Sequence, residues 1–334
     1  MNKKSLMKWV FVSVIVLTMC LGTVGSAWAK KEIVLDFVSF IPVKMFEFSR
    51  WKVAFIDKVN KQAKGKLKIR VRGGPEVIPQ FDQAMAVKKG IVHMMYSPSG
   101  FFTSVVPGLD SWRLSELTAQ EERDTGAFDV ISEMCEKAGY KYLGRALTAN
   151  QGIFWLFTNK KAEKPEDFKG MKIGASPSFH GYTKGLGAVN TSIQISEYYS
   201  AMERGIVDAF TASLGVYMGI GAYEVTKYVL DEPYYATNSA LLVNLKKWNS
   251  IPEDLQKIIE KAAIEQEKAW PTIRDAEEKR LRGIAEKAGV EFYKLSPEVK
   301  KWYYDAAYET AWKEDAKRFP PEIVQKLKSV LKKK

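Results

Sequence analysis

The sequence predicts an α/β protein built from two similar lobes with a cleft between them. One reason is that the order strand, helix, strand, helix, strand occurs twice, in residues 33–96 and again in residues 171–210. This alternation is typical of a parallel sheet with right-handed crossovers. The second reason is a repeated motif. The stretches "AVKKGIVHMMYS" (86–97) and "AMERGIVDAFTA" (201–212) both contain a charged helix end, a glycine, Ile-Val and a short apolar run. We interpret the motif as the same element in each lobe.

The elements of the first unit follow from periodicity and from turn residues. The nearly continuous apolar run "IVLDFVSF" (33–40) predicts a buried strand. Helical spacing of Trp51, Phe55 and Val59 predicts a helix that Gly65 ends. The alternating run "KLKIRVR", the helical run "FDQAMAVKKG" and the apolar run "IVHMMY" complete a strand, a helix and a strand.

The second unit repeats this order, and long connectors join the two units. We expect strands at 171–176, 191–195 and 206–210, with helices at 179–188 and 197–205. Residues 140–159 cross from the first lobe to the second, and residues 228–245 cross back. Residues 250–289 predict a long helical segment with a capping box of Ser250 and Glu253, and with Pro271 kinking or splitting it. Two further helical segments end the chain.

These elements divide the chain into three parts. Residues 1–29 form a signal peptide. Lobe I comprises residues 30–152 and 238–285, and lobe II comprises residues 153–237 and 286–334.

Composition and the first residues indicate an exported globular protein. The 334 residues are 46% hydrophobic and 12% aromatic, which suits folded domains with real cores. Three early lysines, an apolar run and Ala27-Trp28-Ala29 have the order of a secretory signal peptide. We expect cleavage after Ala29 and a periplasmic protein, in preference to a retained anchor or a lipoprotein. Export also argues against nucleic acid as the partner of the +12 net charge.

No catalytic or metal-binding pattern stands out. The two histidines, His93 and His180, have no metal-ligand spacing, and Cys135 has no histidine near it in sequence. No nucleophile elbow or phosphate-binding loop is present. We therefore expect no cofactor, no metal and no enzymatic activity, and we interpret the chain as a receptor whose lobes close on a small solute.

In open parallel sheets, ligands bind beyond the carboxyl ends of the strands. The candidate ligand-binding residues that follow from this rule are Phe40, Glu76, Tyr96 and Ser97 in lobe I and Gly174, Ser176, Thr211, Ser213 and Tyr217 in lobe II.

The chain resembles the DctP-type periplasmic solute receptors of tripartite ATP-independent (TRAP) transporters. The resemblance rests mainly on "TNKKAEKPEDFKGMKIGASPSFHGYTKGLGAVNTSIQISEYYSAMERGIVDAF", together with "GGPEVIPQFDQAMAVKKGIVHMM" in the first lobe. It implies a periplasmic-binding-protein-like fold with a long helix spanning both lobes. It also implies uptake of an organic acid through a small and a large membrane subunit, and it leaves a homodimer open.

Departures from the family pattern concern the ligand. The resemblance places Gly174 where many members have an arginine that holds the substrate carboxylate, Phe154 where they have a second basic contact, and Ala212 where an asparagine is frequent. Losing an arginine fork leaves a carboxylate uncompensated in a closed cleft. We therefore expect a bulkier, partly apolar and aromatic anion against Phe154, Trp155 and Phe179. The candidates for a replacement charge are Arg72, Arg113 and Arg145.

Two other functions are left open at this point. One is a sensory receptor of the same shape, which hands ligand status to a membrane kinase. The other is an exported enzyme on the same scaffold, against which the absence of a nucleophile–base pair argues.

Overall fold

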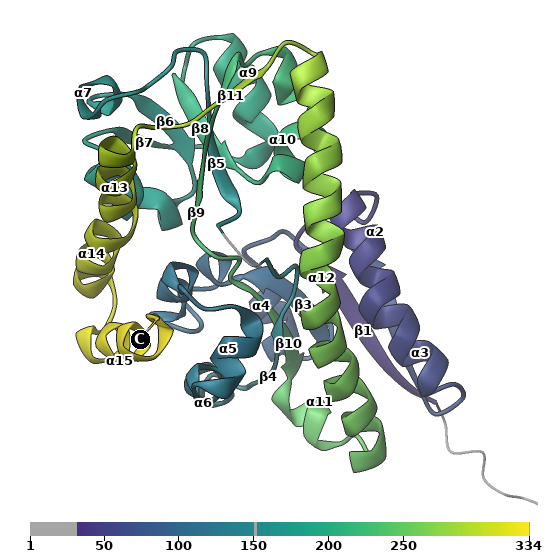
Figure 1. Ribbon diagram of the computed structural model, residues 1–334. Coiled ribbons are helices and arrows are strands. Elements are labelled where there is room, and N and C mark those ends of the chain that lie inside the picture. The colour runs from purple at the N-terminus through teal and green to yellow at the C-terminus, as the bar shows by residue number, and fades with distance from the viewer. Residues whose placement is uncertain (1–31, 150–151, 334) are drawn as a thin grey trace, which may run out of the picture.

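Two β-sheets, each covered by helices, form the two lobes of the molecule (Figure 1). The computed structural model describes residues 32–149 and 152–333, so the predicted signal peptide lies outside the described residues. The strands are β1 (Ile33–Ser39), β2 (Leu67–Gly73), β3 (Met94–Pro98), β4 (Tyr140–Arg145), β5 (Phe154–Thr158), β6 (Lys172–Ala175), β7 (Val189–Ser192), β8 (Ala209–Ala212), β9 (Tyr228–Tyr234), β10 (Ser239–Asn244) and β11 (Glu291–Tyr293). The helices are α2 (Phe46–Lys52), α3 (Lys58–Gln62), α4 (Gln83–Lys88), α5 (Ala119–Asp124), α6 (Ala127–Lys137), α7 (Pro165–Phe168), α8 (His180–Gly185), α9 (Tyr198–Glu203), α10 (Leu214–Gly219), α11 (Leu245–Asn249), α12 (Glu253–Lys287), α13 (Pro297–Asp305), α14 (Ala311–Arg318) and α15 (Pro321–Leu331).

The two sheets have the same topology, as the repeated sequence units predict. Lobe I has the strand order β2-β1-β3-β10-β4, and lobe II has β7-β6-β8-β5-β9 with β11 added at the edge. In each sheet three strands are parallel, and the next strand is antiparallel to them. The three strands of each repeated unit are thus parallel, as predicted, and the antiparallel strands come from the connectors. The antiparallel strands β5 and β10 are the ones that arrive from the other lobe, so they enter their sheet from the cleft side.

The repeated motif is a helix end that the same hydrogen bonds close in both lobes. The residue after each glycine, Ile91 or Ile206, donates its N–H to the carbonyl of Ala86 (3.0 Å) or Ala201 (2.9 Å). Each glycine has a positive φ, 74° in the first copy and 68° in the second. This is a Schellman arrangement. In both copies the alanine four residues before the glycine supplies this carbonyl, and its small side chain is buried.

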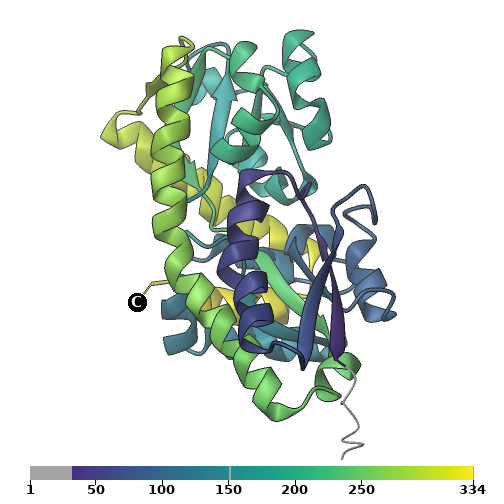
Figure 2. The same ribbon diagram turned by 90° about the vertical axis from the view of Figure 1, so that its right-hand side faces the viewer.

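The long helix α12 runs through both lobes as one continuous element, although Pro271 lies inside it (Figure 2). Proline has no N–H, so the carbonyl four residues earlier loses its helical partner. Here that carbonyl belongs to Glu267, and the hydroxyl of Thr148 donates to it at 2.9 Å. The predicted split of the helix at Pro271 is therefore wrong, because a residue from the connector replaces the missing donor.

The predicted capping box of Ser250 and Glu253 is also wrong. Ser250 follows α11 and its hydroxyl donates to the carbonyl of Lys247 at 2.7 Å, while Pro252 precedes the first turn of α12. In lobe II the strand expected at 191–195 starts earlier, as β7 (Val189–Ser192), and a 3-10 turn occupies Ile195–Glu197.

The C-terminal helices join the lobes on the side away from α12. The segment of α13 and α14 packs against α8 of lobe II, whereas α15 packs against α6 and the 3-10 helix η3 (Leu109–Leu114) of lobe I. Within the described residues, no helix is long and apolar enough to cross a membrane.

Candidate ligand-binding site

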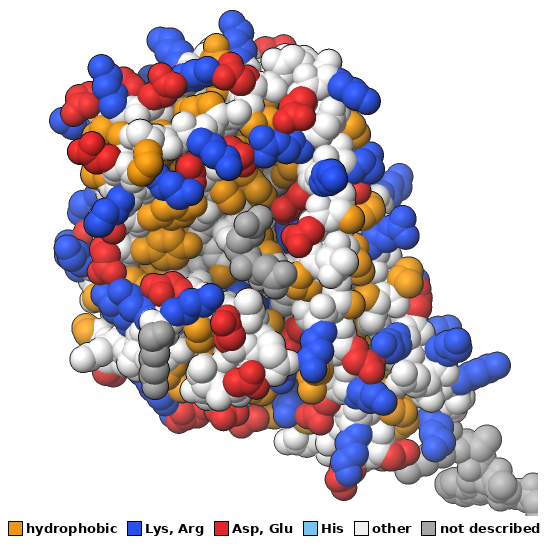
Figure 3. All heavy atoms as spheres, viewed as in Figure 1, with side chains coloured by type: hydrophobic (Ala, Val, Ile, Leu, Met, Phe, Trp, Pro, Cys, Tyr) orange, Lys and Arg blue, Asp and Glu red, His pale blue; other side chains and the backbone are white. Residues whose placement is uncertain are grey.

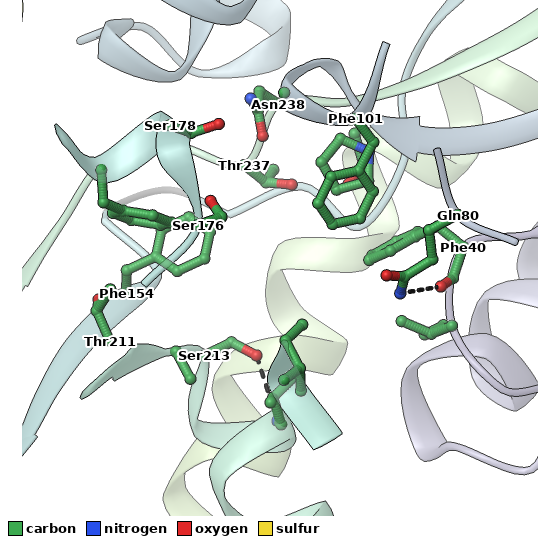
Figure 4. Close-up of a pocket in the computed structure, with 18 of the residues that line it drawn as sticks. Phe40, Gln80, Phe101, Phe154, Ser176, Ser178, Thr211, Ser213, Thr237 and Asn238 are labelled. Atoms are coloured by element: carbon green, nitrogen blue, oxygen red, sulfur yellow. Dashed lines mark hydrogen bonds between the residues drawn. The ribbon is translucent and has the colours of Figure 1, made fainter. Parts of the chain in front are cut away.

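A cavity of about 410 Å³ lies between the two lobes and receives side chains from both of them (Figure 4). It lies beyond the carboxyl ends of the parallel strands, where the sequence places the cleft. Both connectors and the middle of α12 also contribute to its lining, through Leu147, Ile153, Thr237, Asn238, Ser239 and Arg274.

Aromatic rings form two opposite walls. In lobe I, Phe101 lies 6.1 Å from Phe40 and 5.1 Å from Phe81, measured between ring centroids. In lobe II, Phe154 and Phe179 meet edge to face at 4.9 Å. In Figure 4 Phe40 and Phe101 lie on one side of the open space, with Phe154 on the other. Two walls of this kind suit a flat or bulky apolar group.

Neutral hydrogen-bonding groups line the space between these walls. Their side chains come from both lobes and from the second connector, and they are Ser176, Ser178, Thr211, Ser213, Thr237 and Asn238. Asn238 is held in place because its amide donates to Ser99 Oγ at 2.7 Å and to Asp110 Oδ1 at 3.2 Å. A solute with hydroxyl, carbonyl or amide groups can replace its water contacts here.

Two arginines reach the cavity, and each already has acidic partners in the protein. Arg113 is buried and forms two hydrogen bonds to Asp315, at 2.8 and 3.0 Å, and an ion pair with Asp110 at 3.3 Å. Arg274 on α12 pairs with Glu278 at 3.2 Å. Burial raises the pKa of the Asp110 carboxyl, and Arg113 opposes this shift.

Two glutamates also line the cavity. Glu197 accepts a hydrogen bond from the backbone N–H of Gln194 at 2.9 Å. Glu47, in the first turn of α2, lies at the opposite side of the cleft and reaches Gly215 of lobe II. Burial raises the pKa of the Glu47 carboxyl, and Arg274 acts in the opposite direction.

Half of the residues predicted from the sequence line the cavity. They are Phe40, Arg113, Phe154, Ser176, Phe179, Thr211 and Ser213. The other half do not, and they are Glu76, Tyr96, Ser97, Arg145, Trp155, Gly174 and Tyr217.

Two of the predicted residues that do not line the cavity are buried within the lobe I sheet and its core. Tyr96 lies in the core of lobe I against Trp51, with ring centroids 4.6 Å apart. Its neighbour Ser97 is buried in the middle of the sheet, where it pairs with Ala240 of β10.

In lobe II, Phe154 faces the cavity, so its neighbour Trp155 points to the other face of the sheet. Trp155 lines a second hollow between α12 and the C-terminal helices, where Figure 3 shows apolar side chains ringed by charged ones. Tyr217 stacks on Phe157 at 3.9 Å and forms a hydrogen bond with Thr226.

Two of the three proposed replacement arginines are engaged elsewhere. Arg145 is buried against Trp112 and pairs with Glu122, with a hydrogen bond of 2.9 Å from Nε. Arg72 lies 3.8 Å from Asp36 on the surface of lobe I. Arg113 is the one of the three that reaches the cavity.

Glu76 and Gly174 do not line the cavity for local reasons. Glu76 is exposed and accepts a hydrogen bond from the backbone N–H of Gly74 at 2.7 Å. At Gly174 the space that a side chain would need is filled, because a Cβ there would lie 2.8 Å from Cδ1 of Ile193. Ile193 is the residue that faces the cavity instead.

Sequence reasoning missed Glu47, Gln80, Phe101, Ile193, Asn238 and Arg274. Phe101 lies beyond the end of a predicted strand, so the strand-end rule could have found it with a wider window. Asn238 lies in the connector 228–245, directly before β10, where that rule does not apply. Glu47 and Arg274 lie on helices, and nothing in their spacing separates them from the many charged residues of those segments.

Comparisons with curated sequences give similar proteins from other bacteria. A solute-binding protein of Albidiferax ferrireducens is 26% identical over 275 residues, which span 78% of this chain and 79% of the relative. An uncharacterised protein of Haemophilus influenzae is 33% identical over 143 residues, and that match spans 42% of this chain and 43% of the relative.

Solved structures share the fold. A TRAP periplasmic solute-binding protein from Desulfovibrio salexigens with bound orotic acid superposes with a TM-score of 0.78 at 18% identity, covering 90% of this chain and 99% of the other. One from Rhodoferax ferrireducens with bound malonate gives a TM-score of 0.76 at 23% identity, covering 89% and 96%. The α/β fold with two sheets and a long helix is thus that of periplasmic binding proteins, as predicted.

The family model of the bacterial extracellular solute-binding proteins of family 7 matches residues 47–318. These proteins are receptors and not enzymes. The match covers most of the chain and most of the residues around the cavity; it begins after strand β1 and Phe40. This chain therefore belongs to the DctP family of TRAP periplasmic solute-binding proteins.

Proposed function

We propose that this protein is the periplasmic receptor of a TRAP transporter for an organic acid with a bulky apolar body, aromatic acids being the best match. The observation that carries the proposal is the cavity itself. Phenylalanine pairs face each other across it, and the guanidinium of Arg274 lies in its lining.

Arg274 is the better candidate for the carboxylate of the solute. A guanidinium has five N–H donors. In Arg274, Nε and Nη2 donate to the carbonyls of Thr148 and Leu147, and Nη1 donates to Glu278. One N–H on each terminal nitrogen is left, which is the pair that a carboxylate accepts in a bidentate contact. Nε of Arg113 has no partner either, but Arg113 offers less, because two carboxylates, those of Asp315 and Asp110, already balance its charge.

Delivery completes the proposed function. Residues 1–29 direct export and are removed, and the closed receptor then presents the solute to the small and large membrane subunits. Family membership and the cross-lobe cavity support this role. Co-expression with the two membrane subunits in a strain that lacks other uptake routes should give uptake of the solute, and removal of the receptor should abolish it.

A thermal-shift screen tests the ligand class. The exported protein is unfolded and refolded to remove carried-over solute, and is then mixed with aromatic acids, indolic acids, amino acids, small aliphatic acids and neutral aromatics. A ligand that binds the native state alone raises Tm by mass action. We expect hits among aromatic acids, and we expect Gly174→Arg to weaken them, because the new side chain must push Ile193 into the cavity. Hits confined to small aliphatic acids would contradict the proposed ligand class.

A further inference from the structure

The charged groups of the cavity are not all paired, and the group that lacks a side-chain partner is negative. Both arginines and Glu197 have partners within the protein. Glu47 has no side-chain partner: among residues 32–149 and 152–333, its own backbone N–H is the group that donates to its carboxylate. A carboxylate without a side-chain partner in a closing cleft is costly, because it loses water without gaining a countercharge.

Glu47 lies where a solute bound between the lobes could contact its carboxylate. Its carboxylate stands between the lobes, since a Cβ added at Gly215 of α10 would overlap with Oε1. It is also close enough to Arg274 for the guanidinium to lower the pKa of the carboxyl, although the two do not form an ion pair within 4.0 Å. A negative and a positive group therefore lie near each other in the same part of the cavity.

We infer that the solute carries a protonated nitrogen close to its carboxylate, and that the nitrogen lies against Glu47 when the lobes close. This inference rests on the proposed receptor function and narrows its ligand class. The carboxylate of the solute takes the two remaining N–H groups of Arg274, the ammonium takes the carboxylate of Glu47, and the apolar body extends between Phe40 and Phe154. The three features together describe an amino acid or a similar zwitterion with a bulky apolar side chain.

Matched probes with one carbon skeleton test the inference. The aromatic series is 3-phenylpropionate, 2-phenylethylamine and phenylalanine. The indolic series is indole-3-propionate, tryptamine and tryptophan, and the aliphatic series is 4-methylpentanoate, 3-methylbutylamine and leucine. Calorimetry gives Kd for each probe with wild-type protein and with Glu47→Gln. The control is Glu260→Gln, which removes the same charge from α12 at a residue that pairs with Lys141 away from the cavity.

We expect the zwitterion of at least one series to bind wild-type protein about tenfold or more tightly than its nitrogen-free acid, since a charge-assisted hydrogen bond supplies that much. Glu47→Gln should remove this preference by weakening the zwitterion, and it should tighten binding of the nitrogen-free acid, which then no longer buries a carboxylate without a countercharge. Glu260→Gln should change neither Kd. Equal binding of acid and zwitterion, or an undiminished preference in Glu47→Gln, overturns the inference.

Stability of the ligand-free protein gives a result that does not depend on any probe. If Glu47 has no side-chain partner, Glu47→Gln leaves Tm unchanged or raises it at pH 7, since the amide oxygen of glutamine can still accept from the backbone N–H. A lower Tm would mean that the carboxylate is already paired within the protein, and the inference would be wrong. If no probe binds, mass spectrometry of the solute extracted from protein purified without refolding decides the matter, because a solute without a basic nitrogen overturns the inference.

The outcomes separate this inference from the function on which it rests. A protein that binds and closes on nitrogen-free acids retains the proposed receptor function and contradicts the role of Glu47 alone. A protein that binds no solute and never closes contradicts the receptor function itself.

Discussion

His93 and Asp208 occupy equivalent places in the two lobes and make equivalent contacts with different chemistry. The backbone N–H of Asp36 donates to Nδ1 of His93 at 2.9 Å, and that of Lys172 donates to a carboxylate oxygen of Asp208 at 2.8 Å. In return, the backbone N–H of His93 donates to the carbonyl of Asp36, and that of Asp208 donates to the carbonyl of Lys172. The ionisable residue of the repeated motif thus joins the start of one strand to its parallel neighbour in each lobe.

This arrangement makes lobe I sensitive to acid. Nδ1 accepts a hydrogen bond, so the imidazole must be unprotonated there, and burial together with Lys247 lowers the pKa of His93. A histidine whose folded pKa is lowered binds fewer protons when folded, so its contribution to stability is lost as the pH falls below its ordinary value of about 6.5. We expect the free energy of unfolding to decrease from pH 7 to pH 5, and His93→Asn to reduce that decrease.

Urea titrations at several pH values measure this effect. The protein has two histidines, so His180→Asn is a matched control, and it should keep the pH dependence of the wild type. An identical pH dependence in wild type and His93→Asn would show that His93 is not responsible.

At the level of single elements, the two Schellman ends offer an internal comparison. Gly90 and Gly205 have positive φ, and no atom lies within 4 Å of a Cβ added at either position. An alanine there meets no steric obstacle in its surroundings and bears only the backbone cost of a left-handed conformation. We expect Gly90→Ala and Gly205→Ala each to lower the free energy of unfolding by about 1–2 kcal/mol. Chemical denaturation measures both, and a large difference between them would mean that the lobes are not equivalent at this element.

The interior proline of α12 makes a second prediction at the same scale. Thr148→Val removes the hydroxyl that satisfies the carbonyl of Glu267, so we expect it to cost about 1–3 kcal/mol of unfolding free energy. In a Pro271→Ala background the new N–H can donate to that carbonyl, and the same substitution should cost less. A double-mutant cycle measures the coupling. Strict additivity of the two changes would show that Thr148 does not compensate for Pro271.

At the scale of the whole molecule, the connectors between the lobes hold strained residues. Leu147 has φ of 56° and Tyr235 has φ of 53°, and one lies in each connector. Arg274 of α12 donates to the carbonyl of Leu147, and the hydroxyl of Tyr308 accepts from the N–H of Tyr235. The long helix and the C-terminal helices therefore hold the two strands at the places where hinge motion would need backbone rotation.

Contact between the lobes gives a direct test of closure. A Cβ added at Gly100 of lobe I would overlap with Oγ of Ser178 in lobe II and lie 2.9 Å from Asp110. We expect Gly100→Ala to hinder closure, so that solute weakens or fails to reduce the radius of gyration in small-angle X-ray scattering. The stability of the ligand-free protein should change little. Adding Ser178→Gly should partly restore closure. Normal closure of Gly100→Ala alone would show that the lobes do not meet here.

Local patterns in the sequence were sufficient for the fold class and the two repeated units, and half of the candidate residues line the cavity. Strand and helix periods, glycine ends and the strand-end rule depend on residues that are close in sequence, and they pointed to Phe40, Ser176 and Thr211, which lie in the lining. Phe154 and Phe179 were found through the family resemblance. The motif around Gly90 and Gly205 was readable for the same reason, because its hydrogen bonds span only five residues.

Tertiary structure alone decided the direction of the connecting strands and the electrostatics of the cavity. Which face a strand residue shows depends on the register of its neighbours, and this separated Phe154 from Trp155. Which arginine is free depends on acids distant in sequence: Arg145 is bound by Glu122, whereas Arg274 keeps two N–H groups near Glu47, whose carboxylate has no side-chain partner. Long-range pairing of charges leaves no local pattern, so the side chains proposed to bind the solute became visible only once the two lobes and α12 were brought together.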